Sequence, residues 1–450
     1  MSDSHHSVAS YLKFIVPSLL GIVFFLLPVE YDGKWTIPMG VLSDGFKDLA
    51  GAALPGIVLG IVMVSLIGSL GVTIWKRVNK RSRPSNFWHS FNVTTPWLLL
   101  RIAGTVIAVC IFYELGPQWL HGDKTGKIVF YDLAIPIVSI FLFAGFLLPL
   151  LTDYGVMELV GSLARRPFQF LFGLPGRSSI DCMASWMSAS VVGVLLTAQQ
   201  YDRGYYSARE AAVISTNFSI VSLPFCLIVA EFARLDHMFI QYYLTVVLAG
   251  VVAAIIVPRL PPLSRIPDNY SPAGKQVLDE ENVDQPLMAR SLDAALKKAS
   301  LAPGAYSWFK SSLANVTDIW FGLMPPLMFI ATAALVMAEY TPIMQWISLP
   351  YVPLLELLQI PEAEKAAPAF VVGFAEMFLP AVIAAGIESE LTRFVIIATS
   401  IVQLIYMSEM GVFVLKSNIP LNLLQLFLIF VVRTLVTLPI VAAVAHFLVF

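Results

Sequence analysis

Charged side chains lie inside several long apolar stretches of the sequence, where burial of an unpaired charge costs several kcal/mol. Glu376 lies in "FVVGFAEMFLPAVIAAG" (370–386), Glu409 in "QLIYMSEMG" and Arg433 in "FLIFVVRTLV". A buried carboxylate can hold a cation, exchange a proton or accept hydrogen bonds from hydroxyl groups. Arg433 is far from both ends of its stretch, so we expect an ion pair with Glu376 or Glu409. Arg101 is near the end of its stretch and is expected to extend its head group to water.

Each of these side chains has an alternative interpretation. Glu376 is alternatively a structural cap on the helix ends of a hairpin, because Pro380 follows it closely. Glu409 is alternatively a carboxylate at the membrane interface. For Arg433 the alternative to an ion pair is direct contact with a substrate.

Small polar residues accompany the charges. Asn217 and Ser219 lie in "STNFSIVS", Ser188 lies in "MASWMSASVVG", and Thr399 and Gln403 are four residues apart. Residues four apart share one face of a helix, and a polar face inside an apolar helix should turn toward protein or water. We expect these residues to line a cavity, with close helix packing as the alternative. The predicted substrate-binding set is Glu376, Gln403, Thr399, Asn217, Ser219 and Ser188, and the predicted ion-coupling or ion-pair set is Glu376, Glu409 and Arg433.

Motifs of catalysis and metal binding are missing from the sequence. It contains neither the phosphate-binding GxxxxGK[ST] nor the zinc-binding HExxH. The three cysteines, Cys110, Cys182 and Cys226, show no CxxC spacing. The net charge of −2 indicates no nucleic-acid partner. We therefore expect a protein that is not an enzyme and has no catalytic residues, no metal site and no cofactor, with Na⁺ or H⁺ as candidate coupling ions.

The composition predicts an integral membrane protein of the all-α class. Hydrophobic residues make up 58% of the chain and charged residues 13%, with a mean hydropathy of +0.78; soluble domains carry about 25% charged residues. A membrane-spanning helix needs about 20 apolar residues. The first apolar stretch has no cleavage site of the small-x-small type, so we expect a retained helix rather than a signal peptide. The nine predicted spans are 11–28, 51–75, 96–114, 132–152, 210–231, 238–257, 318–338, 393–415 and 421–449.

Basic residues predict the orientation of the spans. The segment "KRVNKRSR" (76–83) is strongly basic and should be cytoplasmic, which places the N-terminus in the cytoplasm. The polar segment 258–317 should also be cytoplasmic, as an extended linker that ends in a short helix at "SLDAALKKA". Two further apolar runs are 180–199 and 368–387, and both conditions hold only if the first of them enters and leaves on one face. We predict that these runs are re-entrant hairpins, with two additional full spans as the alternative.

A repeat relates the two halves of the chain. Asp153-Tyr154 and Glu339-Tyr340 each end an apolar span, and a proline follows each acidic residue after 22 positions. Each half continues with a short apolar run, a charged turn and two spans, at an offset of 184 to 186 residues. The predicted orientations make the repeat inverted, which is an architecture of secondary transporters. We expect the hairpin tips to meet near the membrane midplane, where non-helical backbone needs a polar cavity.

Part of the sequence resembles a known family. "LVGSLARRPFQFLFGLPGRSS", "MASWMSASVVG" and "YSAREAAVISTNFSIVSLPF" together resemble the nucleoside-recognition Gate domain of concentrative nucleoside transporters and bacterial ferrous-iron transporters. The whole chain resembles the YjiH family of bacterial inner-membrane proteins. The resemblance covers roughly 140–260, with a weaker copy from 325 onward. It implies a permease-like fold and supports Glu376 and Gln403 as binding residues.

These observations predict four regions. They are an N-terminal three-helix membrane region (1–130), a first Gate-like repeat (131–260), a cytoplasmic linker with a short helix (261–317) and a second, inverted repeat (318–450).

The function predicted for this arrangement is secondary transport of a small polar metabolite, nucleoside-like, coupled to Na⁺ or H⁺ in the bacterial inner membrane. The alternatives are a Gate subunit of a multi-component ion or export permease and a membrane scaffold that transports nothing. The expected partners are the lipid bilayer and a small-molecule substrate, together with either a second copy of the chain or a small Gate-domain subunit.

Overall fold

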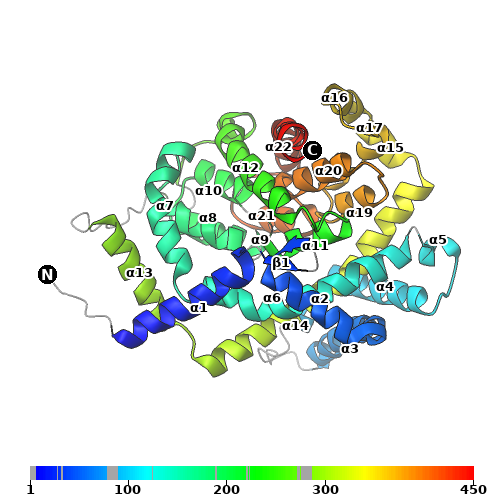
Figure 1. Ribbon diagram of the computed structural model, residues 1–450, viewed down its shortest axis with the longest axis horizontal. Helices are drawn as coiled ribbons and strands as arrows, with labels where there is room; N and C mark the ends of the chain where they lie inside the picture. The colour runs from blue at the N-terminus through cyan, green and yellow to red at the C-terminus, as the bar shows by residue number, and fades with distance from the viewer. Residues whose placement is uncertain are drawn as a thin grey trace. The chain divides into compact units, whose positions relative to one another are not determined.

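Helices account for almost all regular structure of the computed structural model, which confirms the all-α class (Figure 1). The structure describes residues 7–27, 29–31, 34–78, 90–123, 125–187, 190–218, 221, 223–270, 274 and 286–450. Within these residues the strands are β1 (Val29–Tyr31) and β2 (Lys34–Thr36), which form one antiparallel pair.

The chain packs as two compact units. Unit 1 contains residues 1–36, 148–303 and 348–450, and unit 2 contains residues 37–147 and 304–347. The division into four regions predicted from the sequence stays a prediction. The helices of unit 2 are α2 (Pro38–Ala50), α3 (Leu54–Val78), α4 (Thr95–Phe112), α5 (Gln118–His121), most of α6 (Ile135–Thr152), α14 (Ala305–Tyr340) and most of α15 (Ile343–Ser348). The helices of unit 1 are α1 (Val8–Leu26), α7 (Val156–Phe172), α8 (Ser178–Met187), α9 (Ser190–Asp202), α10 (Ala208–Asn217), α11 (Leu223–Phe232), α12 (Phe239–Ile256), α13 (Leu287–Leu301), α16 (Val352–Leu357), α17 (Ala363–Ala366), α18 (Ala369–Val372), α19 (Leu379–Ala385), α20 (Glu390–Gln403), α21 (Val412–Lys416) and α22 (Leu423–Val444).

Seven helical segments of the described residues are long and apolar enough to cross a membrane. They are Val8–Phe25, Pro38–Lys76, Thr95–Phe112, Ile128–Thr152, Phe239–Arg265, Ala305–Met337 and Leu423–Val449. Each overlaps one of the nine predicted spans, although Pro38–Lys76 and Ala305–Met337 begin well before the predicted 51–75 and 318–338. The chain is a multi-pass membrane protein.

The two other predicted spans, 210–231 and 393–415, are wrong as continuous helices. The first is divided into α10 and α11, and the second ends as α20 at Gln403. Pro224, the second residue of α11, has no N–H group and cannot donate the hydrogen bond that would join α11 to a preceding helical turn. Leu404 takes a left-handed conformation with φ of 60°, which ends α20. Met407–Gly411 then forms a π-helical turn that leads into α21.

The segments 180–199 and 368–387 are each built from two short helices that pack together. Helix α8 contacts α9, and α18 contacts α19. The longest of the four, α9, has 13 residues and a length of roughly 20 Å. A membrane core of about 30 Å needs more than this, so none of these helices spans it alone. Re-entry of each pair from one membrane face stays a prediction.

The order of elements in the two halves corresponds. In each half a hairpin of short helices precedes a broken helix and then a long final helix, α12 or α22. The breaks follow Asn217 and Gln403, which are 186 positions apart and match the predicted offset. Serine caps the first part of each broken helix, Ser207 at α10 and Ser389 at α20. The inverted relation of the halves stays a prediction.

The expectation that Arg101 extends to water is wrong. Its side chain is only 3% exposed. Within unit 2 it donates from Nη1 to Ser69 Oγ over 2.5 Å and from Nη2 to the Ser90 carbonyl over 2.9 Å. A hydroxyl on α3 and a loop carbonyl therefore replace the water that the sequence pattern led us to expect.

The short helix predicted in the polar segment is present as α13. It is more than a surface helix, because Ala295, Leu296 and Ala299 are buried against Phe14 of α1 and Val156 of α7. Most of 271–285, the preceding part of the predicted linker, lies outside the described residues.

Candidate functional site

Helix α20 ends in the interior of unit 1, where its carbonyl groups need partners. The last four C=O groups of a helix have no acceptor role inside the helix itself. The hydroxyl of Tyr406, which is fully buried, lies within hydrogen-bond distance of Ser400 O (2.9 Å) and Ile401 O (3.0 Å). The Ile405 N–H donates to Gln403 O over 2.8 Å. Two residues just beyond the break thus donate hydrogen bonds to the end of α20, the single Tyr406 O–H being shared between two carbonyl groups.

Arg433 supplies the partner of the remaining carbonyl in this turn. It lies midway along α22, which packs beside α20 (Figure 1), and its side chain is fully buried. Its Nε donates to Val402 O over 2.9 Å, and its Nη1 donates to Asn217 Oδ1 over 2.5 Å. Asn217 is the last residue of α10. One guanidinium therefore connects the ends of both broken helices.

Asn217 is held in place by its own helix. Its Nδ2 donates to Val213 O over 3.2 Å and to Thr216 Oγ1 over 3.0 Å. With both amide hydrogens directed into α10, its Oδ1 is left to accept from Arg433. The amide orientation that this network requires is therefore the one that presents an acceptor to the guanidinium.

Gln403 connects the end of α20 to the second hairpin and to α22. Its Nε2 donates to Phe370 O of α18 over 3.1 Å and to Thr434 Oγ1 over 2.9 Å. A Cβ atom added to Gly373, in the hairpin turn, would lie 2.4 Å from Gln403 Oε1. The glycine therefore lets the hairpin backbone approach this amide closely.

Glu376 lies in the same hairpin turn and is 5% exposed. Its Oε2 accepts hydrogen bonds from Phe378 N (2.6 Å) and Leu379 N (3.2 Å) at the start of α19. These bonds are those of a helix cap, the alternative considered for this residue. A second connection joins the turn to the broken helix, since Met407 N donates to Phe374 O over 2.8 Å.

The predicted site residues divide into two groups. Asn217, Gln403 and Arg433 belong to one connected set of hydrogen bonds with Thr434, and Glu376 lies in the adjoining hairpin turn. Thr399 is fully buried one turn before Gln403. Ser188, Ser219 and the side chain of Glu409 lie outside the described residues. An ion pair of Arg433 with Glu376 or Glu409, and a binding role for each residue, stay predictions.

Three polar atoms of this region have no hydrogen-bond partner among the described residues. They are Thr399 Oγ1, Gln403 Oε1 and Arg433 Nη2. Buried polar atoms are usually satisfied, so each of these three needs an explanation, such as an ordered water molecule, an ion or a functional role. In the same described part of the chain, no group of three or more His, Cys, Asp or Glu could hold a metal ion.

A cavity of about 120 Å³ lies beside the end of α10. Its walls include Asn217 and three phenylalanines, Phe168, Phe172 and Phe218, whose ring centroids are 4.9 to 5.5 Å apart. An apolar cavity of about 150 Å³ can hold a benzene molecule. The space beside Asn217 is somewhat smaller than this, and its walls are almost wholly apolar.

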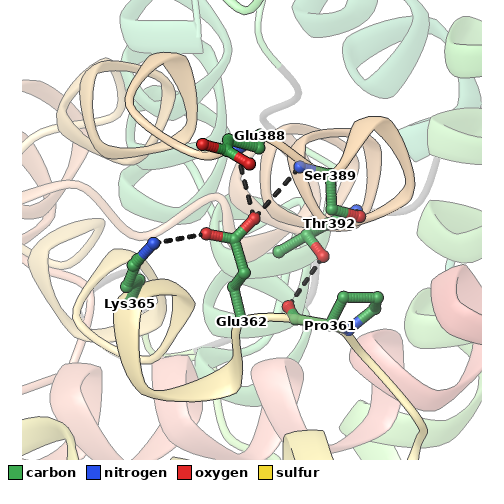
Figure 2. Close-up of polar contacts among 6 residues, drawn as sticks. All are labelled: Pro361, Glu362, Lys365, Glu388, Ser389 and Thr392. Carbon is green, nitrogen blue, oxygen red and sulfur yellow. Dashed lines mark hydrogen bonds and ion pairs between the residues drawn. The ribbon is translucent and has the colours of Figure 1, made fainter.

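The base of the second hairpin is closed by Glu362, as Figure 2 shows. Glu362 Oε1 accepts from the backbone N–H groups of Glu388 and Ser389, both over 3.1 Å, and its Oε2 pairs with Lys365 over 2.7 Å. The Thr392 hydroxyl also donates to Pro361 O, over 2.8 Å. The hydrogen bond from Lys365, followed by that from the Ser389 N–H, lowers the pKa of Glu362 below its ordinary value.

The first hairpin has a comparable closure at its base. The Tyr206 hydroxyl, just before α10, donates to the Asp181 carboxylate in the first turn of α8. In the first half Asp181 accepts from the segment before α10, and in the second half Glu362 accepts from the segment before α20.

Several of these residues could not be recognised from the sequence. Tyr406 and Thr434 resemble ordinary residues of apolar spans, and Glu362 resembles a solvated loop residue. The available signal was indirect: Thr434 follows the isolated Arg433, and Tyr406 lies three residues after Gln403.

The comparisons with known proteins agree with this architecture. A family model described as nucleoside recognition, the Gate domain, matches residues 134–235, which extend from the start of α6 to the end of α11. An uncharacterized protein of Alkalihalophilus pseudofirmus is 47% identical over 442 residues, covering 97% of this chain and 94% of that protein. No solved structure matches the chain.

The chain is therefore a multi-pass membrane protein with a Gate domain, as its sequence motifs indicated. It belongs to the same protein family as the Alkalihalophilus pseudofirmus protein. The weaker Gate-like copy in the second half lies outside the matched residues and stays a prediction.

Proposed function

We propose that this protein is a secondary transporter that moves a small polar metabolite, with a nucleoside as the preferred substrate, coupled to a gradient of Na⁺ or H⁺. The observation that carries the proposal is the pair of broken helices, interrupted 186 positions apart after Asn217 and Gln403. Secondary transporters with internal repeats build their substrate sites from paired discontinuous helices near the membrane midplane.

The chemistry around the breaks supports a polar substrate. Glu376, Asn217, Thr399 and Gln403 are buried at or near the helix ends and the second hairpin. Ser188 and Ser219 complete the proposed set, with Glu409 and Arg433 as ion-coupling or ion-pair residues. Amide and hydroxyl groups at such a position can bind the hydroxyls of a ribose and the polar edge of a base.

Two further observations support a nucleoside over other metabolites. The Gate model that matches residues 134–235 is described as nucleoside recognition. The cavity beside Asn217 has an aromatic wall, and flat rings pack favourably against phenylalanine. The helical membrane fold and this family also favour a transporter over an enzyme.

The proposed setting is the bacterial inner membrane, with the N-terminus and the basic segment 76–83 in the cytoplasm. The two hairpins enter the membrane from opposite faces, and their tips lie near the midplane beside the broken helices. The proposal includes either a second copy of the chain or a small Gate-domain subunit as a protein partner.

Uptake into proteoliposomes tests the function. Purified protein is reconstituted, and uptake of labelled nucleosides, sugars and amino acids is followed with a Na⁺ gradient, with a proton gradient and with neither. We expect saturable uptake of a nucleoside that excess unlabelled nucleoside inhibits and that one of the gradients drives. Protein-free liposomes serve as the control. Well-folded protein that transports no member of the panel under any gradient would contradict the proposal and favour a Gate subunit that needs another chain.

A further inference from the structure

The position of Arg433 has a consequence for the coupling ion. Its guanidinium is fully buried and lies at the C-terminal turns of two helices, α10 and α20. Nε bonds to the Val402 carbonyl over 2.9 Å and Nη1 bonds to the Asn217 side-chain oxygen over 2.5 Å. Both contacts are to neutral oxygen atoms, which are also the ligands that a hard cation such as Na⁺ accepts.

The electrostatics of this junction favour one positive charge. The C-terminus of a helix carries the equivalent of roughly −0.5 elementary charge, and the effect acts within the last turn. Two such termini together favour a positive charge between them, and the guanidinium supplies one. In secondary transporters with discontinuous helices, C-terminal helix ends and unwound carbonyl groups hold the coupling Na⁺.

We propose that Arg433 is a resident cation that occupies the junction of the two broken helices, so that Na⁺ does not bind there in the native protein. The side chain takes the ligands that a mobile ion would use. The inference rests on the proposed transport function, because it concerns its coupling. It excludes only a Na⁺ site at this junction.

Val402 and Asn217 each present an oxygen atom that needs a donor or a cation. Val402 O belongs to the last turn of α20, where it has no partner inside the helix. The Asn217 amide is oriented by its bonds to Val213 O and Thr216 Oγ1, so that Oδ1 remains an acceptor. Removal of the guanidinium therefore leaves two oriented oxygen ligands in a buried space, a starting arrangement for a cation site.

Cation binding by purified Arg433→Ala tests the inference. Thermal unfolding midpoints of wild type and variant are measured in detergent while choline is replaced by Na⁺ or by low concentrations of guanidinium at constant ionic strength. We expect the wild-type midpoint to be indifferent to the replacement. We expect the Arg433→Ala midpoint to be lower in choline and to rise, saturably, with guanidinium or Na⁺, because a ligand that binds only the folded state stabilises it.

Two control variants separate this role from ordinary loss of a buried side chain. Arg433→Lys keeps the positive charge and should not respond to Na⁺. Arg101→Ala removes another buried arginine, whose partners are Ser69 Oγ and the Ser90 carbonyl, and its midpoint should not rise with Na⁺. If Arg433→Ala is recovered only when guanidinium is present during purification, that result supports the inference. In that case the unfolding midpoint of Arg433→Gln is measured in Na⁺ and in choline instead.

Two results would overturn the inference. One is a saturable stabilisation of the wild-type protein by Na⁺ that Asn217→Ala abolishes, because Na⁺ would then bind at the junction in the presence of Arg433. The other is a folded Arg433→Ala or Arg433→Gln protein that neither cation stabilises relative to choline. Because these measurements do not involve transport, they are independent of the uptake assay. A failed uptake assay with a positive cation response would contradict the transport function and leave the resident cation in place.

Discussion

At the scale of single residues, several buried polar groups of unit 1 are partners of interrupted backbone. Tyr406 and Arg433 satisfy carbonyl groups at the end of α20, and Glu376 accepts the N–H groups at the start of α19. Irregular backbone at membrane depth is stable only when such partners are present. A residue with this structural task can also serve transport, and substitutions that keep its geometry distinguish the two roles.

Glu376→Gln is the substitution that isolates the charge of Glu376. Glutamine keeps an acceptor oxygen for Phe378 N and Leu379 N but removes the negative charge. We expect the variant to fold and to lose uptake, or to lose its dependence on the ion gradient. Uptake and the unfolding midpoint are measured together, and Glu356→Gln, at an exposed carboxylate of α16, serves as the control. Normal ion-coupled uptake by a stable Glu376→Gln variant would show that the charge is dispensable.

Glu362 gives the base of the second hairpin a dependence on pH. Its pKa is lowered in the folded protein, first by the Lys365 hydrogen bond. Its stabilising contribution is therefore complete above the unfolded pKa of about 4.3 and is lost as the pH falls through the lower folded value. At neutral pH the wild type should unfold at a higher temperature than Glu362→Gln. The difference between the two unfolding temperatures should shrink as the pH is lowered below about 4.3. A difference that stays constant over this pH range would contradict the assignment.

At the scale of elements, the second hairpin and α20 depend on each other. Phe370 O and Gly373 of the hairpin approach the Gln403 side chain, and Phe374 O accepts from Met407 N beyond the break. These contacts join the hairpin directly to the end of α20, so a displacement of the hairpin would break or shift them. This is the connection that a transport cycle with moving hairpins would use.

Gly373→Ala tests that connection. The new Cβ would lie 2.4 Å from Gln403 Oε1, and rotation of the amide would break the bonds from Nε2 to Phe370 O and Thr434 Oγ1. We expect destabilisation of about 1–3 kcal/mol, the usual range for overpacking, and reduced uptake, measured by denaturant unfolding and by transport. Gly386→Ala is the matched control, because its nearest neighbour would be 3.5 Å away. Equal stability of the two variants would show that Gln403 adjusts without cost.

At the scale of the whole molecule, the predicted inversion of the halves requires that equivalent loops lie on opposite sides of the membrane. The loop before α10 should be cytoplasmic and the segment of α16 should be external. Cysteine at Arg203 or at Glu356, both exposed, can be labelled in intact cells with a membrane-impermeant reagent. The background lacks Cys110, Cys182 and Cys226. Labelling at position 356 alone is expected, and labelling at position 203 from outside would rule out the inverted model.

The membrane spans were predictable from the sequence because hydropathy is a local property that sums over about 20 residues. Seven spans and the two shorter apolar runs, 180–199 and 368–387, could be found in this way, and the spacing of acidic residues and prolines indicated the offset between the halves. So could the isolation of Arg433, since a charge in an apolar stretch is visible without its partners. The breaks in 210–231 and 393–415 were missed, because an apolar run has the same hydropathy whether its helix continues or not.

The tertiary structure decided which groups meet. Arg433 bonds to Asn217 across 216 positions of the sequence and to Val402 across 31, and no local pattern specifies either distance. The same holds for Arg101, whose buried serine and carbonyl partners exist only once α3 and the loop at Ser90 have packed around it. Composition determined that the chain lies in a membrane. The pairing of backbone and side-chain groups over long separations determined where its helices stop, because a helix can end inside the bilayer only where other parts of the fold supply its missing hydrogen bonds.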